Sequence, residues 1–151
     1  MNTPRYLEEI AVGEKRISEP FELTEADSVA FALRYDPQPM HVDRESSERG
    51  PFHGLIASGW QTTAIVMSLI VGMQPFGSTP LLGLGVDELR WPIPVRPGDR
   101  ITGESEVISI TASKSKPQFG IVRVHITGRN QNNEVVLSMF SSLWIAKRPT
   151  A

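Results

Sequence analysis

The sequence contains no cysteine among its 151 residues, and it has no excess of basic residues. Without thiols, disulfide bonds, thiolate metal sites and cysteine nucleophiles are excluded together. The 15 Lys and Arg residues face 17 Asp and Glu residues, which gives a formal net charge of −2. That balance argues against a general nucleic-acid-binding protein, because such proteins carry a basic face. No His-x-His or paired-carboxylate spacing points to a metal site, so we expect neither a metal nor a cofactor.

Length and composition predict one globular domain over residues 1–151, since 40% of the residues are apolar and 21% are charged. The first nine residues include acids and no apolar stretch, which is unlike a signal peptide. The most apolar run, residues 64–73, is half as long as the roughly 20 residues that a membrane span needs. We therefore expect a cytoplasmic protein with no membrane partner.

Charged residues are also missing from one long segment, because no Asp, Glu, Lys or Arg occurs between Gly50 and Val86. The pattern predicts a helix over residues 57–73, with Ser58 as its N-cap and its end before Gln74 and Pro75. A helix that is apolar all round belongs in a core. We expect this helix to be buried on nearly all of its faces.

A second helix is predicted upstream, where Thr24 precedes acidic residues in the manner of an N-cap. Its expected buried stripe is Ala26, Val29, Ala30 and Leu33, at i, i+3, i+4 and i+7. The helix should end at Asp36, because the following proline disfavours helical geometry. Residues 43–50 predict a short polar helical turn closed by glycine.

After Pro80 the pattern changes to the alternation of strands. Apolar and polar residues alternate over residues 101–109 and 121–126, and residues 133–146 are rich in strand-forming types. A short strand is expected within residues 16–23. Strands joined by turns form an antiparallel sheet, and a strongly curved one can wrap the apolar helix, which makes the fold class α+β. Exposed edge strands in such a sheet favour a homodimer joined edge to edge.

Two clusters carry residues suited to chemistry. In the first, residues 35–41, two prolines separate Asp36 from His41, which together can exchange protons with a water or a substrate. The alternative is a carboxylate that caps a turn and a surface histidine. The second cluster, residues 52–60, has Gly54 and Gly59 at the start of the apolar helix, where free N–H groups suit an oxyanion. These glycines are equally consistent with tight entry of the chain into a core.

Together the clusters read Asp-x-Gln-Pro-x-His and then Phe-x-Gly-x-Ile-Ala-x-Gly. This order resembles MaoC-like dehydratases and R-specific enoyl-CoA hydratases, and the similarity extends over nearly the whole chain. It implies a hot-dog fold, a single domain with a long central helix wrapped by an antiparallel sheet, and a dimer. It also implies that Asp36 and His41 are catalytic and that the amide of Gly59 forms an oxyanion hole. Gln38 and Ser58, grouped with Gly59 as oxyanion or substrate-binding residues, stand where the family commonly has Asn and His.

The resemblance implies a hydro-lyase that hydrates 2-enoyl-CoA thioesters or dehydrates 3-hydroxyacyl-CoA, so the expected partner is an acyl-CoA substrate. One alternative is a hot-dog subunit that binds acyl thioesters without turnover. A hot-dog thioesterase fits less well, because its carboxylate usually lies on the central helix, where this chain has none. We expect His53 in a loop and His125 pointing outward from a strand. Trp60, Met67 and Phe76 are expected in the core or in an acyl pocket.

Overall fold

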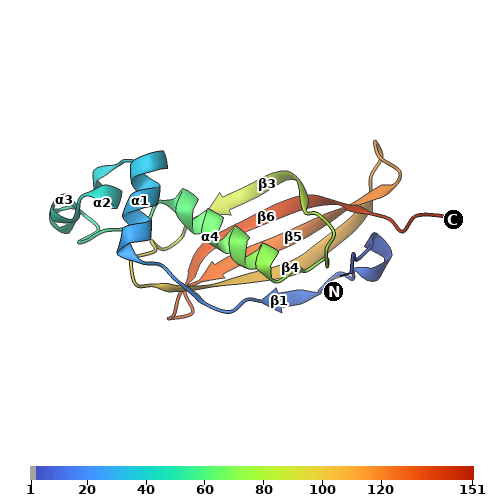
Figure 1. The fold of residues 1–151 in the computed structure, drawn as a ribbon, viewed down its shortest axis with the longest axis horizontal. Coiled ribbons are helices and arrows are strands. Elements are labelled where there is room, and N and C mark those ends of the chain that lie inside the picture. Colours follow the sequence, from blue (N-terminus) through green and yellow to red (C-terminus); the bar gives the residue numbers. More distant parts are fainter. Residues whose placement is uncertain (1–2) are drawn as a thin grey trace.

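The structure is a computed structural model that describes residues 3–151. A short 3-10 helix, η1, spans Leu7–Glu9. The four α-helices are α1 (Glu25–Tyr35), α2 (Pro39–Val42), α3 (Arg44–Arg49) and α4 (Gly59–Gly72). The strands are β1 (Lys15–Ile17), β2 (Phe21–Glu22), β3 (Leu82–Arg90), β4 (Arg100–Ala112), β5 (Phe119–Arg129) and β6 (Val135–Ala146). Figure 1 shows α4 lying across the sheet, with α1, α2 and α3 grouped beyond its N-terminal end.

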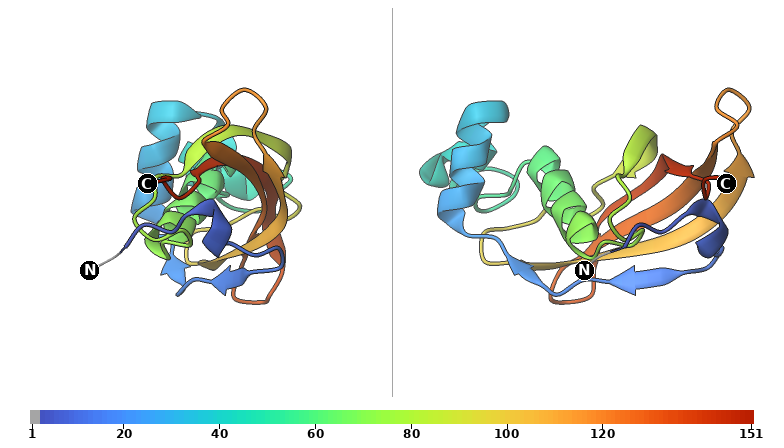
Figure 2. Two further views of the ribbon diagram at one scale, coloured as in Figure 1. Left: turned by 90° about the vertical axis from the view of Figure 1, so that its right-hand side faces the viewer. Right: turned by 45° about the vertical axis from the view of Figure 1, so that its right-hand side comes forward.

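The six strands form one antiparallel sheet in the order β1-β4-β5-β6-β3, with β2 paired to β4. The sheet curves around one side of α4 (Figure 2). Instead of the single short strand expected near residues 16–23, the chain forms β1 and β2, which both pair with β4. The predicted α+β architecture, one domain with a central helix against a curved antiparallel sheet, is confirmed.

Alternation along the strands supplies the surface that packs on α4. In β5, Val122, Val124 and Ile126 are buried, whereas Arg123 and His125 lie half-buried on the opposite face. Two glycines on the inner face of the sheet, Gly103 and Gly128, allow α4 to approach the strands closely. A Cβ at Gly128 would lie 2.7 Å from a methyl group of Val66, so a side chain there would force the helix away from the sheet.

The helix ends follow the sequence signals. The side chain of Thr24 accepts a hydrogen bond from the Asp27 N–H (3.2 Å) and caps α1, and Asp43 caps α3 in the same way. The stripe predicted for α1 is wrong, however, because Ala26, Ala30 and Leu33 are exposed and the buried positions are Ser28 and Ala32. The buried face of α1 is set by its contact with α2 and α4 and not by its most apolar side.

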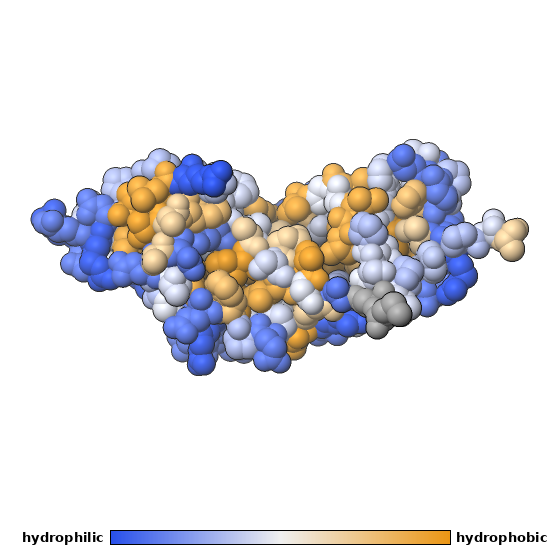
Figure 3. Space-filling model, in the orientation of Figure 1, coloured by the Kyte–Doolittle hydropathy of each residue, from blue (hydrophilic) through white to orange (hydrophobic). Residues whose placement is uncertain are grey.

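The expectation that α4 is buried on nearly all faces is also wrong for the single chain. Trp60 is 58% exposed and Val71 is 50% exposed, and Ala64 and Ser68 lie between them on the same exposed side. The sheet covers one side of α4 and α1 contacts its first turns, but the side that carries these four residues stays exposed. Apolar surface therefore remains along α4 and over α1, as Figure 3 shows.

The edge strand β3 is exposed at every residue except Leu89 and carries exposed apolar side chains at Leu82, Leu84 and Val86. Its partner on one side is β6, and its other edge is unpaired among residues 3–151. Within the same residues, no helix is both long and apolar enough to cross a bilayer.

Packing of α4 generates a stability prediction. Ile70 is buried against the sheet and the next residue, Val71, faces outward. Ile70→Ala should lower the free energy of unfolding by about 2–5 kcal/mol, because the surrounding strands cannot collapse into the cavity. Val71→Ala, the matched control, should change it by no more than about 0.5 kcal/mol. Urea denaturation followed by circular dichroism measures both, and equal effects would contradict the observed orientation of α4.

Candidate active site

Asp36 and His41 are brought together by the short turn between α1 and α2. Asp36 is the C-cap of α1, and its carbonyl accepts a hydrogen bond from the Gln38 N–H (2.8 Å). Pro39 then begins α2, which places His41 one turn further on, with its N–H donating to the Gln38 carbonyl (2.9 Å). The two prolines of this segment restrict the backbone, so the two side chains are held at a fixed separation.

The imidazole of His41 is only 5% exposed, and both of its nitrogens have a partner. Nδ1 lies 2.7 Å from the carbonyl oxygen of Ile56. Because a carbonyl oxygen can only accept, Nδ1 carries a proton and donates it. Nε2 lies 3.3 Å from Oδ2 of Asp36. An unprotonated Nε2 and a carboxylate would repel each other, so these two atoms are placed to share a proton or a water.

The carbonyl that orients His41 belongs to a buried extended segment, residues 55–58. The Ile56 N–H donates to the carbonyl of Met40 (3.1 Å), and the Ala57 N–H donates to that of Val95 (2.7 Å). These bonds fix the segment between α2 and the connection that precedes β4. The tautomer of His41 is therefore determined by residues distant in sequence.

The carboxylate of Asp36 accepts two further hydrogen bonds from side chains. Gln38 Nε2 donates to Oδ1 (2.8 Å), and Ser58 Oγ donates to Oδ2 (2.7 Å). These donors, Gln38 first and Ser58 second, lower the pKa of Asp36 below its ordinary value, and the nearby His41 adds to the effect. Partial burial opposes it. Asp36 is thus held in its ionised form beside His41.

Ser58 and Gly59 form the N-terminal end of α4. Ser58 is the N-cap, as predicted, but it is fully buried and its hydroxyl bonds to Asp36 instead of capping the helix. Gly59 is the first helical residue; the Gln61 N–H donates to the Ser58 carbonyl (3.0 Å), whereas the N–H groups of Gly59 and Trp60 have no acceptor within the helix. The partial positive charge of this helix end suits an oxygen that gains negative charge.

His41 and Gly59 line the same cavity, whose volume is about 210 Å³. Its other walls come from the loop before α4 and from the segment after β3, and they include Phe52, Trp91 and Ile93. Asp36 contacts His41 but does not line this cavity. Ser58 and Gln38, expected to contact the substrate, both direct their polar groups to Asp36. Gln38 and Ser58 therefore stabilise the ionised form of the Asp36 carboxylate.

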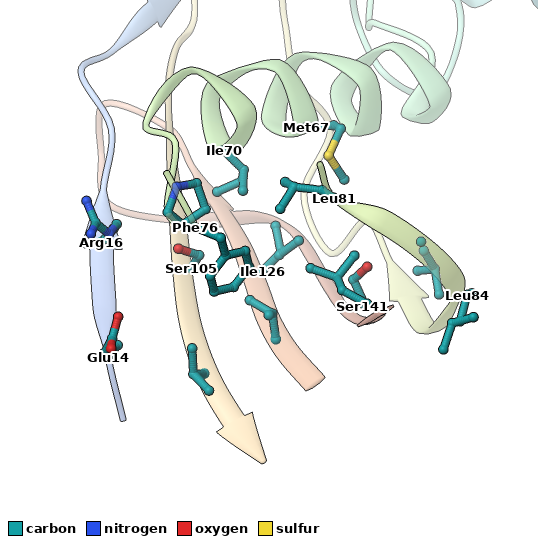
Figure 4. Close-up of a pocket in the computed structure, with 17 residues that line it drawn as sticks. Glu14, Arg16, Met67, Ile70, Phe76, Leu81, Leu84, Ser105, Ile126 and Ser141 are labelled. Atoms are coloured by element: carbon teal, nitrogen blue, oxygen red, sulfur yellow. The ribbon is translucent and has the colours of Figure 1, made fainter. Parts of the chain in front are cut away.

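A second cavity of about 360 Å³ lies between the C-terminal half of α4 and the sheet. Figure 4 shows Met67, Ile70, Leu81, Phe76 and Ile126 around it, together with the hydroxyl groups of Ser105 and Ser141. The predicted positions of Met67 and Phe76 agree with these walls, whereas Trp60 is exposed. The cavity shares no lining residue with the one at His41.

The remaining histidines lie apart from this site. His53 is exposed in the loop before α4, and His125 lies on the outer face of the sheet, where Nε2 is 2.9 Å from the hydroxyl of Ser138. Sequence reasoning missed Trp91, whose ring packs on Gly59. The sequence shows only that an aromatic residue stands between a predicted strand and two prolines, and this pattern does not indicate a contact with Gly59. In residues 3–151, no three His, Asp or Glu side chains converge in a way that could hold a metal ion.

The fold and the site define a class of protein: a hot-dog domain with an Asp-His pair at the N-terminus of its central helix. The chain belongs to the family described as MaoC like domain, which it matches over residues 9–130. A MaoC-like dehydratase from Rhodospirillum rubrum is 41% identical, with a TM-score of 0.85 over 96% of this chain and 99% of that one. The R-hydratase PhaJ1 from Pseudomonas aeruginosa is 25% identical, with a TM-score of 0.77 over 96% of this chain and 88% of that one. An uncharacterised Bacillus subtilis protein, YdeM, is 31% identical over 83% of this chain and 87% of its own length.

The hydrogen bonds to Asp36 generate a prediction about its titration. Ser58→Ala removes one donor, so the pKa of Asp36 should rise toward its ordinary value. Nuclear magnetic resonance of the carboxyl carbon measures this shift directly. Ser68→Ala is the control, because that hydroxyl bonds only to the Ile65 carbonyl of its own helix. An unchanged titration of Asp36 in Ser58→Ala would contradict the assignment.

The same pKa shift has a consequence for stability. Folding lowers the pKa of Asp36, so the interaction stabilises the folded protein above the ordinary carboxyl pKa. This stabilisation is lost as the pH falls through the lowered pKa. Ser58→Ala should therefore lose less stability than the unaltered protein between neutral and acid pH, as measured by urea denaturation across that range.

Proposed function

We propose that this protein is a hydro-lyase that adds water to 2-enoyl-CoA thioesters, or removes it from 3-hydroxyacyl-CoA. The observation that carries the proposal is the 3.3 Å contact between Asp36 and His41 beside the free N-terminal end of α4. An acid–base pair next to a site for an enolate oxygen is what hydration of an unsaturated thioester requires. Membership of a family that includes a dehydratase and an R-hydratase supports the same reaction.

In the proposed hydration, a water hydrogen-bonds to Asp36 and to Nε2 of His41. The pair takes one proton from this water, and the hydroxide forms a bond to the β-carbon of the enoyl thioester. Because Nδ1 of His41 is committed to the Ile56 carbonyl, Nε2 is the nitrogen that exchanges the proton. Asp36 remains ionised through its bonds to Gln38 and Ser58, so it stabilises the positive charge that His41 acquires.

The electron pair of the double bond moves toward the thioester as the hydroxide adds, which gives an enolate. In this mechanism the N–H of Gly59, at the positive end of α4, donates to the enolate oxygen. The pair then returns its proton to the α-carbon, and the product is the 3-hydroxyacyl thioester. The reverse sequence of steps dehydrates it. No further reactant is needed.

Two alternative functions, a binding subunit without turnover and a thioesterase, would place different requirements on the site. A hot-dog subunit that binds acyl thioesters without turnover would need the cavities but not the proton exchange at Nε2. A thioesterase would need a carboxylate or a water-activating group on α4, and residues 50–86 contain no acid. The oriented Asp36–His41 pair favours the hydro-lyase over both.

The catalytic roles predict large losses of turnover. Asp36→Asn and His41→Ala should each lower kcat by about 10²–10⁴-fold, because each removes one member of the acid–base pair. The assay follows the absorbance of the enoyl-thioester band with a panel of 2-enoyl-CoA substrates. Thermal unfolding of each variant checks that the loss is not one of folding.

His125→Ala is the matched control, because this histidine lies on the outer face of the sheet and should leave kcat unchanged. Unaltered protein that binds 2-enoyl-CoA but never hydrates it would favour the binding subunit. Release of free CoA without hydration would favour the thioesterase. Either result ends the hydro-lyase proposal.

The proposal includes a homodimer joined through β3. This edge strand exposes Leu82, Leu84 and Val86, and Figure 1 shows it at one edge of the sheet on which α4 packs. An apolar edge strand of this length is a site for pairing with another chain. A second copy that pairs with β3 around a twofold axis would cover the strand edge and part of the apolar surface in one contact.

Such a dimer also gives the larger cavity a place in catalysis. Residues 83–86 of β3 line that cavity, while the end of β3 leads to Trp91, next to Gly59. Antiparallel pairing of β3 with its copy sets the first half of one strand beside the second half of the other. The apolar cavity of one protomer would then lie near the partner's catalytic site and could receive the acyl chain.

The dimer proposal predicts that a charge at the middle of β3 separates the protomers. Val86→Asp should elute as a monomer in light scattering at micromolar concentration, because a carboxylate would be desolvated in the paired edge. Val12→Asp, at another exposed valine, is the control and should remain dimeric. A monomeric unaltered protein, or a dimeric Val86→Asp protein, would contradict pairing through β3.

A further inference from the structure

Trp91 lies directly on the first residue of α4. A Cβ built on Gly59 would be 2.6 Å from Cδ2 of the indole and less than 3 Å from two more of its ring atoms. Only glycine at position 59 permits this contact. The ring is fixed from two further directions, because its Nε1 donates to Thr63 Oγ1 (3.0 Å) and the edge of Trp60 packs on it at 5.1 Å between centroids. These contacts restrict the orientation of the Trp91 side chain, although part of the ring is at the surface.

The same ring is a wall of the cavity that contains His41 and Gly59. It is 40% exposed, so it retains open surface after its contacts with Gly59 and Thr63. The opposite walls, which include Ile56 and Val95, belong to buried segments that cannot recede without disturbing the core. Among the large apolar side chains that line this cavity, Trp91 is the one that packs directly on Gly59.

We propose that Trp91 is a specificity-determining residue that restricts substrates to acyl groups unbranched at the α-carbon. The proposal rests on the function given above, in which the thioester oxygen binds the Gly59 N–H. The α-carbon of the substrate is two bonds from that oxygen, so it lies within a few ångströms of Gly59 and beside the indole that covers it. A hydrogen on this carbon fits against the ring, whereas a methyl group must displace it.

The inference predicts a change in preference between two substrates that differ by one methyl group, but-2-enoyl-CoA and 2-methylbut-2-enoyl-CoA. Trp91→Ala should raise the ratio of kcat/KM for the branched substrate to that for the unbranched one by at least about tenfold, the usual scale for one carbon in an apolar pocket. Trp91→Phe, which keeps a ring, should stay close to the unaltered protein. A ratio is independent of the fraction of folded enzyme, so partial misfolding of Trp91→Ala does not obscure it.

Trp144→Ala is the matched control. It removes an equal side chain that packs on Phe119, and it neither lines the cavity nor contacts Trp91, so the ratio should not change. An unchanged ratio in Trp91→Ala, or an equal change in Trp144→Ala, would overturn the assignment of specificity to the ring over Gly59.

Fluorescence provides a second test that does not need turnover. The sequence has three tryptophans, at positions 60, 91 and 144, so Trp60→Phe with Trp144→Phe leaves Trp91 as the only one. Titration of this protein with but-2-enoyl-CoA, with Asp36→Asn added to prevent reaction, should shift or quench the emission of Trp91 as the ring becomes covered. No change while calorimetry shows binding would overturn the proposal for Trp91. If the unaltered protein hydrates no 2-enoyl-CoA but the emission still changes, the proposed reaction fails and the placement of Trp91 beside the acyl group stands.

Discussion

The burial of one side of α4 against the curved sheet is the constraint on which the rest of the structure depends. The helix has no charged residue, and its burial on Val122, Val124 and other inner-face residues of the sheet fixes where its N-terminus lies. That end carries Ser58 and Gly59, so the packing of the core determines the position of the candidate oxyanion site. Close approach of the helix at Gly128 shows how little freedom this arrangement has.

The acid–base pair is built on this fixed end. Ser58 is where a helix normally uses a hydroxyl to cap its own N–H groups, yet the hydroxyl bonds to Asp36. The helix thereby keeps unpaired N–H groups at its start, and the carboxylate gains a donor that holds it ionised. One side-chain orientation thus serves both halves of the proposed reaction, the proton exchange at His41 and the stabilisation of the enolate at Gly59. Gln38 supplies the second donor, because its side-chain amide donates a hydrogen bond to Oδ1 of Asp36.

The exposed half of α4 and the edge of β3 mark the side on which a single chain is incomplete. Trp60, Val71 and Val86 are each about half exposed. Leaving several large apolar side chains in contact with water is unfavourable, and such surface commonly marks an interaction site. The cavity of about 360 Å³ is lined by residues 83–86 of β3 and lies at the opposite end of α4 from His41. The proposed association through β3 would cover the edge and would set the cavity of one chain near the Asp36–His41 pair of the other.

The sequence by itself determined the α+β class, the N-cap of α1, the glycine that closes α3 and the start of α4 at Ser58. Each depends on local residue types and on the 3.6 and 2.0 periods of helix and strand. Its motif predicted that Asp36, His41 and Gly59 form one site; the structure brings Asp36 to His41 and sets His41 and Gly59 in one cavity that Asp36 does not line. Only the tertiary structure decided which face of α1 is buried, that α4 has an uncovered side and that β1 and β2 are separate strands. Likewise, it alone directed Ser58 and Gln38 to Asp36, set the proton of His41 on Nδ1 through Ile56 and laid Trp91 on Gly59. These features depend on contacts between residues far apart in the chain, and local periodicity carries no information about which distant surface a side chain meets.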